Sequence, residues 1–209
     1  IPVYCTPSFP QGTEPITLVE FAGISNTTAA STSSPSYENY TTMTGNVIQG
    51  ETYPIRLKGN TNGSYSGYFK VYADWNNNGV FEATEGYELG YINSSTGIDD
   101  KELLGSITVP SNAAVGNTRM RVMKKFASQS IPACNLDSYG QAEDYTLIVA
   151  AAQVNVEVTV ATQGNVPATI TANTGTLQLI TNISPATVDQ SVTWSVTSGT
   201  AFASVSQTG

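Results

Sequence analysis

One twelve-residue segment has the oxygen-bearing residues and the spacing of a calcium-binding loop. It runs from Asp74 to Glu85 with the sequence DWNNNGVFEATE, which places Asp or Asn at positions 1, 3 and 5, glycine at 6 and Glu at 12. Calcium takes about six to eight oxygen ligands, and alternate side chains converge on one ion only where glycine lets the backbone turn sharply. The expected ligands are the carbonyl of Val80 and the side chains of Asp74, Asn76, Asn78, Glu82 and Glu85.

The composition of the loop predicts a weak structural site. At position 9 the ligand is either Glu82 itself or a water molecule, and Glu85 closes the coordination sphere with both oxygens. Two Asn ligands lower the charge of the site, which predicts an extracellular-type Kd of about 10⁻⁴ to 10⁻³ M. The run before the loop alternates like a strand, so a bound ion is expected to stabilise the fold and not to switch it. The alternative is an Asn-Gly hairpin that binds no metal.

The chain has two cysteines, Cys5 and Cys134, and no histidine. A disulfide is the expected pairing. In the chain-entropy model, closing so long a loop restricts the unfolded chain and thereby stabilises the folded state by about 4 to 5 kcal/mol. The alternatives are two free thiols or a catalytic cysteine, and both are disfavoured because there is no histidine to activate a nucleophile. A disulfide implies an oxidising compartment.

Two basic and two acidic residues are expected to form a structural ion pair. Arg119 and Arg121 share one face of an expected strand, whereas Glu143 and Asp144 point to opposite faces of another. One carboxylate should meet one arginine, and losing a partner of such a pair costs about 3 to 5 kcal/mol. The alternatives are that Asp144 is a distant calcium ligand and that the arginines form a patch for acidic glycans. A general acid–base pair is disfavoured by the opposite orientations.

The chain contains 11 tyrosines, whose rings can stack on sugar faces. Most are expected in cross-strand aromatic pairs, as at Tyr65, Tyr68 and Tyr72. Aromatic residues in loop-rich segments are better candidates for an exposed platform. These are Tyr37 and Tyr40 and, as the preferred glycan contacts, Trp75, Tyr87 and Tyr91.

Composition favours a non-catalytic extracellular β protein. Only 11% of the residues are charged, and the chain is rich in Thr, Ser, Asn and Val, which are strand and turn residues. The net charge of −8 argues against nucleic acid as a partner. No stretch approaches the roughly 18 apolar residues of a membrane-spanning helix. The start has neither an initiator Met nor a signal sequence, so the chain is expected to be processed or excised.

Short alternating runs predict a β-sandwich in the first part of the chain. A boundary is expected at residues 150–153, which gives domains at 1–150 and 151–209. Alternation continues in the second domain, where Trp194 is expected to face the core of an Ig-like sandwich. The expected strands are 15–22, 46–57, 66–74, 87–92, 101–109, 117–125, 143–149, 154–160, 176–180 and 191–196.

Five segments occur in the order typical of one family. They are YC at 4–5, YADWNNNGVF at 72–81, TRMRV at 118–122, PAC at 132–134 and GQAEDY at 140–145. With these, residues 4–149 resemble the GEVED domain, although Gln141 and Ala142 replace the first Glu and the Val of its signature. Such domains belong to large secreted proteins of Bacteroidota and related marine bacteria, attached to peptidases, polysaccharide-degrading enzymes or adhesins, often with type IX secretion signals. The resemblance implies no catalytic role, and it leaves open what the missing Glu changes.

The remaining residues, 154–209, resemble a bacterial Ig-like domain of group 2. The resemblance is carried by GTLQL at 175–179, ISPAT at 183–187, QSVTWSV at 190–196 and ASVSQTG at 203–209. Such domains add one or two strands after the glycine that stands here at 209. The second domain is therefore expected to be incomplete, within a fragment of a longer protein that carries tandem repeats.

Together these features predict an all-β protein of two consecutive β-sandwich domains. The expected function is that of a non-catalytic, calcium-stabilised module of a secreted or cell-surface bacterial protein, acting in adhesion or surface display. Expected partners are polysaccharide or cell-surface glycan and neighbouring domains of the parent chain. The alternative is an accessory module, carbohydrate-binding or spacer, of a secreted polysaccharide-degrading enzyme or peptidase.

Overall fold

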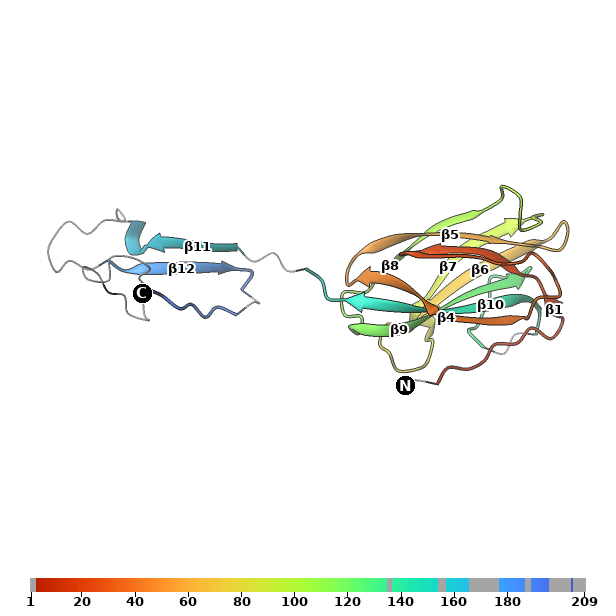
Figure 1. Cartoon of the computed structure of the whole chain (residues 1–209), viewed down its shortest axis with the longest axis horizontal. Coiled ribbons are helices and arrows are strands. Elements are labelled where there is room, and N and C mark those ends of the chain that lie inside the picture. Colours follow the sequence, from red (N-terminus) through yellow and green to blue (C-terminus); the bar gives the residue numbers. More distant parts are fainter. Residues whose placement is uncertain are drawn as a thin grey trace. The chain divides into compact units, whose positions relative to one another are not determined.

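The computed structural model describes residues 3–134, 137–153, 157–165, 177–186, 189–195 and 204. The chain packs as two compact units, residues 1–152 and 153–209. Nearly all of the regular structure is β-strand (Figure 1), which confirms the predicted all-β class. Among the described residues, no helix is long and apolar enough to cross a membrane.

Unit 1 consists of two packed β-sheets. The first sheet has the order β1-β10-β9-β6-β7, and β4 also pairs with β10. Its strands are β1 (Gly12–Thr13), β4 (Tyr37–Ile48), β6 (Ser66–Ala73), β7 (Gly86–Asn93), β9 (Gly116–Phe126) and β10 (Tyr139–Ala150). The second sheet has the order β3-β2-β5-β8. Its strands are β2 (Ile16–Phe21), β3 (Ile24–Thr27), β5 (Thr52–Gly59) and β8 (Leu103–Thr108).

The main core lies between the two sheets. Alternate residues of each strand point inward, as the pleat requires. From the second sheet Val19 and Leu57 are fully buried, and from the first sheet Val71, Val122 and Leu147 are fully buried. Each such side chain contributes roughly 1.5 to 3 kcal/mol through burial.

A second, smaller core covers the outer face of the first sheet. Its buried members are Phe9, Tyr72, Met123, Ile131, Ala133 and Ala142. They come from the segment before β1, from strands β6, β9 and β10, and from the segment after β9. Residues 140–146 of strand β10 therefore have covered side chains on both faces, apart from half-buried Thr146. This double cover is what allows charged side chains to be buried on either side of β10.

Strand β4 is the main departure from the predicted elements. The expected strand at 46–57 is the end of β4 and most of β5, separated by a turn in which Gly50 has a φ of 82°. Most of β4, together with β1 and β3, was not predicted. The sequence of β4 is polar and half-exposed, with no apolar alternation to mark it, and its place is set by parallel pairing with β10.

Within unit 2 the structure describes one antiparallel strand pair, β11 (Glu157–Thr162) with β12 (Leu179–Ser184). These strands overlap two of the predicted runs. Each motif on which the Ig-like resemblance depends lies partly outside the described residues, at 175–176, 187, 196 and most of 203–209, as does the start of the predicted strand at 154–160. The Ig-like assignment and its incompleteness stay predictions.

Candidate functional site

The predicted calcium loop connects β6 to β7 and is organised around Asp74, which is fully buried. Asp74 Oδ1 accepts a hydrogen bond from the Asn78 backbone N–H at 3.0 Å. Asp74 Oδ2 accepts bonds from the Gly79 N–H at 2.8 Å and from the Tyr4 hydroxyl at 2.6 Å. Gly79 has a φ of 86°, which is the left-handed turn that the motif assigns to glycine.

The two Asn residues orient the next part of the loop. Asn76 Oδ1 accepts the Asn78 N–H at 3.0 Å, and Asn78 Oδ1 accepts the Val80 N–H at 2.8 Å. Their amide nitrogens both donate to the Glu82 carboxylate, at 3.3 Å from Asn76 and 2.6 Å from Asn78. The side chains at positions 3, 5 and 9 are therefore neighbours in space.

Glu85 folds back onto the start of the loop from the 3₁₀ turn η1 (Ala83–Glu85). Its Oε1 accepts the Asn76 N–H at 3.3 Å and its Oε2 accepts the Glu82 N–H at 3.2 Å. Burial and, after it, a hydrogen bond with the Glu82 carboxylate together raise the pKa of Glu85 to about 7. The same hydrogen bond, with one from Asn78, lowers the pKa of Glu82.

The donor set of the loop fits calcium. All of the candidate ligands are oxygens, and the two interacting carboxylates, Glu82 and Glu85, supply negative charge that a divalent cation would neutralise. Among the described residues, no group of three or more His, Cys, Asp or Glu side chains is placed to hold a metal ion. An ion in this loop therefore depends on Asn and backbone carbonyl oxygens as well as on carboxylates.

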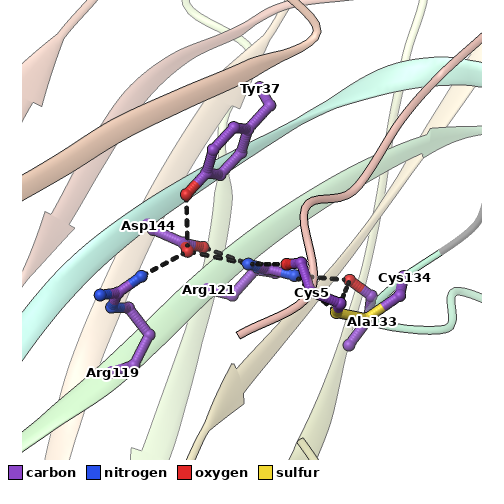
Figure 2. The surroundings of a disulfide bond; sticks show 7 residues. All are labelled: Cys5, Tyr37, Arg119, Arg121, Ala133, Cys134 and Asp144. Carbon is purple, nitrogen blue, oxygen red and sulfur yellow. Dashed lines mark hydrogen bonds and ion pairs between the residues drawn. A yellow bond between two sulfur atoms is a disulfide. The ribbon is translucent and has the colours of Figure 1, made fainter. Parts of the chain in front are cut away.

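Asp144 is the centre of a buried ion-pair cluster next to the disulfide (Figure 2). Arg121 binds it with two parallel bonds, Nε to Oδ1 at 2.6 Å and Nη2 to Oδ2 at 2.8 Å. Arg119 Nη1 and the Tyr37 hydroxyl also donate to Oδ2, at 2.9 and 3.0 Å. Because four donors occupy its two oxygens, Asp144 is not placed to be the distant calcium ligand considered above.

The Cys5–Cys134 disulfide is confirmed, with a Cα–Cα distance of 6.2 Å. Arg121, which is fully buried, links the first sheet to both sides of this bond. Its Nη2 donates to the Cys5 carbonyl and its Nη1 to the Ala133 carbonyl, both at 2.8 Å (Figure 2). The Phe81 ring of the predicted calcium loop lies 4.9 Å from the Arg121 guanidinium carbon, so the loop packs against the same residue.

Asp144 is the carboxylate that meets the arginines, and Glu143, the other candidate for the predicted pair, forms no ion pair with the described residues. Strand alternation turns it to the inner face with Tyr145, whose hydroxyl donates to Glu143 Oε2 at 2.5 Å. Its Oε1 is buried without a hydrogen-bond partner among the described residues. Burial, together with the charge of Glu38, raises the pKa of Glu143 to about 8 even though Tyr145 stabilises its ionised form.

Gln141 makes bonds that need an amide. Its Oε1 accepts the Ile16 backbone N–H at 2.7 Å, and its Nε2 donates to the Pro35 carbonyl at 2.8 Å and to Glu38 Oε2 at 3.0 Å. A carboxylate here could accept the first bond but could not donate the other two. This residue therefore ties β10 to β2 and to the segment that enters β4.

The predicted glycan platform is wrong for Trp75, which is only 4% exposed. Its Nε1 donates to the Tyr87 hydroxyl at 2.9 Å, and that hydroxyl donates to the Thr108 carbonyl at 2.8 Å. These two bonds link the start of the loop after β6 to Tyr87 of β7 and, through it, to Thr108 of β8. Tyr91 is 53% exposed and packs against Tyr68, with ring centroids 5.1 Å apart.

The two other tyrosines assigned to loops, Tyr37 and Tyr40, lie in strand β4. Tyr37 bonds to Asp144, and the Tyr40 ring stacks on Tyr145 with centroids 5.7 Å apart. Both are half-buried. Their hydrogen bond and ring contact serve packing around β10.

The ion pair between Lys124 and Glu14 is buried and was not predicted from the sequence. Lys124 Nζ lies 2.9 Å from Glu14 Oε2, and both side chains are buried. A Cβ on Gly59 or Gly67 would come within 3.0 Å of the Lys124 side chain, so these glycines make room for it. Alternation along RMRVMKK puts Lys124 on the same face as Val122 and Met120, and that inward position is the signal that could have revealed it.

Comparison with known proteins gives a family-model match for part of unit 1. No curated protein matches the chain. Among solved structures, a family 123 glycoside hydrolase from Clostridium perfringens, from a study of glycolipid glycan hydrolysis, is 14% identical with a TM-score of 0.30. The match covers 53% of this chain and 23% of that one, and a likeness this low carries no argument. Residues 68–148, which include the predicted calcium loop and the ion-paired Arg119, Arg121 and Asp144, match the family model of the GEVED domain.

Proposed function

We propose that unit 1 is a non-catalytic, calcium-stabilised module of a larger secreted or cell-surface protein, acting in adhesion or surface display. The observation that carries this proposal is the arrangement of the loop from Asp74 to Glu85. Its side-chain oxygens are pre-positioned by backbone N–H groups of the loop itself. A secreted location and a surface glycan as partner belong to the same proposal, and the disulfide is compatible with them.

Calcium would act by connecting parts of the module. Asp74, Asn76, Asn78, the Val80 carbonyl and Glu85 would hold the ion, directly or through water at Glu82, and its charge would offset the repulsion between Glu82 and Glu85. Asp74 also binds Tyr4, whose ring lies 4.7 Å from the guanidinium carbon of Arg119. A calcium-bound loop would therefore hold the segment that leads to Cys5.

The proposal predicts calcium-dependent stability. With a Kd of about 10⁻⁴ to 10⁻³ M, 10 mM calcium stabilises the folded chain by about 1.4 to 2.7 kcal/mol. For a domain of this size the melting temperature should rise by about 3 to 10 °C over the value in chelator. Differential scanning calorimetry of the full chain measures this rise.

Two variants make the test specific. Asp74→Ala should lower the melting temperature and abolish the calcium-dependent rise. Asp99→Ala is the matched control, because Asp99 also fixes a turn by accepting hydrogen bonds from the Thr96 and Lys101 N–H groups, but outside the loop. It should destabilise equally with and without calcium. A wild-type melt that does not respond to calcium, or an Asp74→Ala variant that still does, would sink the proposal.

A further inference from the structure

Three aromatic rings form a row at one end of the first sheet. Tyr65 precedes β6, Phe126 ends β9 and Tyr139 begins β10. Ring centroids are 5.2 Å apart between Tyr65 and Phe126 and 6.0 Å apart between Phe126 and Tyr139, and both contacts are edge-to-face. The outer two rings are 53% and 40% exposed, so much of the row faces solvent.

A polar hollow of about 260 Å³ adjoins this row. Its lining includes the side chains of Asn62, Ser64 and Thr96, all of them exposed and uncharged. A Cβ placed on Gly63, which also lines the hollow, would lie 3.5 Å from the Tyr65 ring, so the ring stands at the edge of the hollow. We name the row and the hollow together the aromatic tip.

We infer that the aromatic tip is a binding site for a neutral polysaccharide. A sugar unit presents an apolar face of C–H groups, which suits an exposed ring, and a rim of hydroxyls, which suits amide and hydroxyl side chains. A phosphorylated or sulfated ligand would require cationic side chains. The hollow is lined by none, and the ammonium of nearby Lys101 is bound to the carbonyls of Asn93 and Ser94, at 3.1 and 2.5 Å.

The aromatic tip lies at the opposite end of unit 1 from the predicted calcium loop. Strand β6 begins one residue after Tyr65 and ends at Ala73, immediately before the loop. Eight residues of strand span roughly 25 Å, so the two features are separate sites. Strand β10 likewise begins at Tyr139 in the tip and ends at Ala150, near the point where the chain leaves unit 1. A glycan bound at the tip would not obstruct that exit.

This inference rests on the proposed role as a non-catalytic module, and it names the ligand class and the residues of that module's binding site. The test is affinity electrophoresis of the full chain in gels that contain xylan, laminarin or galactomannan. We expect retardation by at least one of these neutral polysaccharides. The retardation should persist in chelator at a temperature below the chelated melting point, because the tip does not contain the calcium loop. Failure of the calcium test and failure of glycan binding are thus distinguishable.

Variants assign the binding to the tip. Tyr65→Ala combined with Tyr139→Ala should weaken binding at least tenfold, as should the milder Asn62→Ala, which keeps the rings and guards against a folding defect. Tyr91→Ala is the matched control, because Tyr91 has the same exposed fraction as Tyr65 but lies outside the tip. The inference is overturned if no neutral polysaccharide binds, if only a sulfated dextran binds, or if Tyr91→Ala abolishes binding while the tip variants keep it.

Discussion

Glu143→Gln should remove a pH dependence from the stability of unit 1. Glu143 is 1% exposed, its Oε1 has no partner among the described residues, and burial raises its pKa from the ordinary 4.5 to about 8. The folded chain therefore holds this proton more tightly than the unfolded chain does. The resulting stabilisation is fully present below pH 4.5 and is lost as the pH rises towards 8.

The raised pKa of Glu143 determines how much the free energy of unfolding changes with pH. A pKa raised from 4.5 to about 8 corresponds to roughly 5 kcal/mol of stability lost across that range. Gln has nearly the same shape as the protonated acid, can still accept the bond from Tyr145, and cannot ionise. The variant should therefore exceed the wild type in stability by roughly 4 to 5 kcal/mol at pH 8, although the two differ little near pH 5.

Urea unfolding at intervals from pH 5 to 8.5 measures the free energy of unfolding of both chains at constant calcium. The difference between them isolates Glu143, because other titrating groups, including Glu85, contribute equally to each. Glu51→Gln, which removes a carboxylate from an exposed turn, should give a curve parallel to that of the wild type. Parallel curves for Glu143→Gln as well would refute the reasoning.

Two further substitutions test the polar layer around β10 by urea unfolding at pH 7. Arg121→Met should lower the free energy of unfolding by about 3 to 5 kcal/mol because it leaves Asp144 buried with fewer donors. Adding Asp144→Leu to this variant should recover most of the loss, and equal losses in the single and double variants would contradict this reasoning. Gln141→Glu should cost about 1 to 3 kcal/mol because the Pro35 carbonyl and Glu38 lose their donor, and an unchanged stability would show that these bonds contribute nothing net.

The parts of the site that the sequence predicts are those encoded by local spacing or by residue type. The calcium motif is recognisable because its ligands and Gly79 lie within one short segment. The disulfide follows from the presence of only two cysteines. Strand alternation correctly separates Asp144 from Glu143, so that only one of these carboxylates is expected to meet the arginines, but it does not say which one.

The parts that could not be predicted depend on pairing between distant segments. Strand β4 is polar throughout most of its length, and only its parallel register with β10, about a hundred residues later, explains why Tyr37 and Tyr40 are half-buried. Burial of Trp75 likewise depends on β7 and β8 closing over it. The burial of both Glu143 and Asp144 requires both cores, because these neighbours point to opposite faces of β10 and a strand covered on only one face would leave one of them in water.

The disulfide also determines how unit 1 would transmit mechanical tension. A tensile force applied to the chain before Cys5 is transmitted through the disulfide to Cys134 and then along β10, which ends at Ala150. The residues between the two cysteines are bypassed and need not unravel. Because the twelve residues of β10 are already extended, the covalent path offers little slack. Under load unit 1 would therefore behave as a nearly inextensible link and not as a spring.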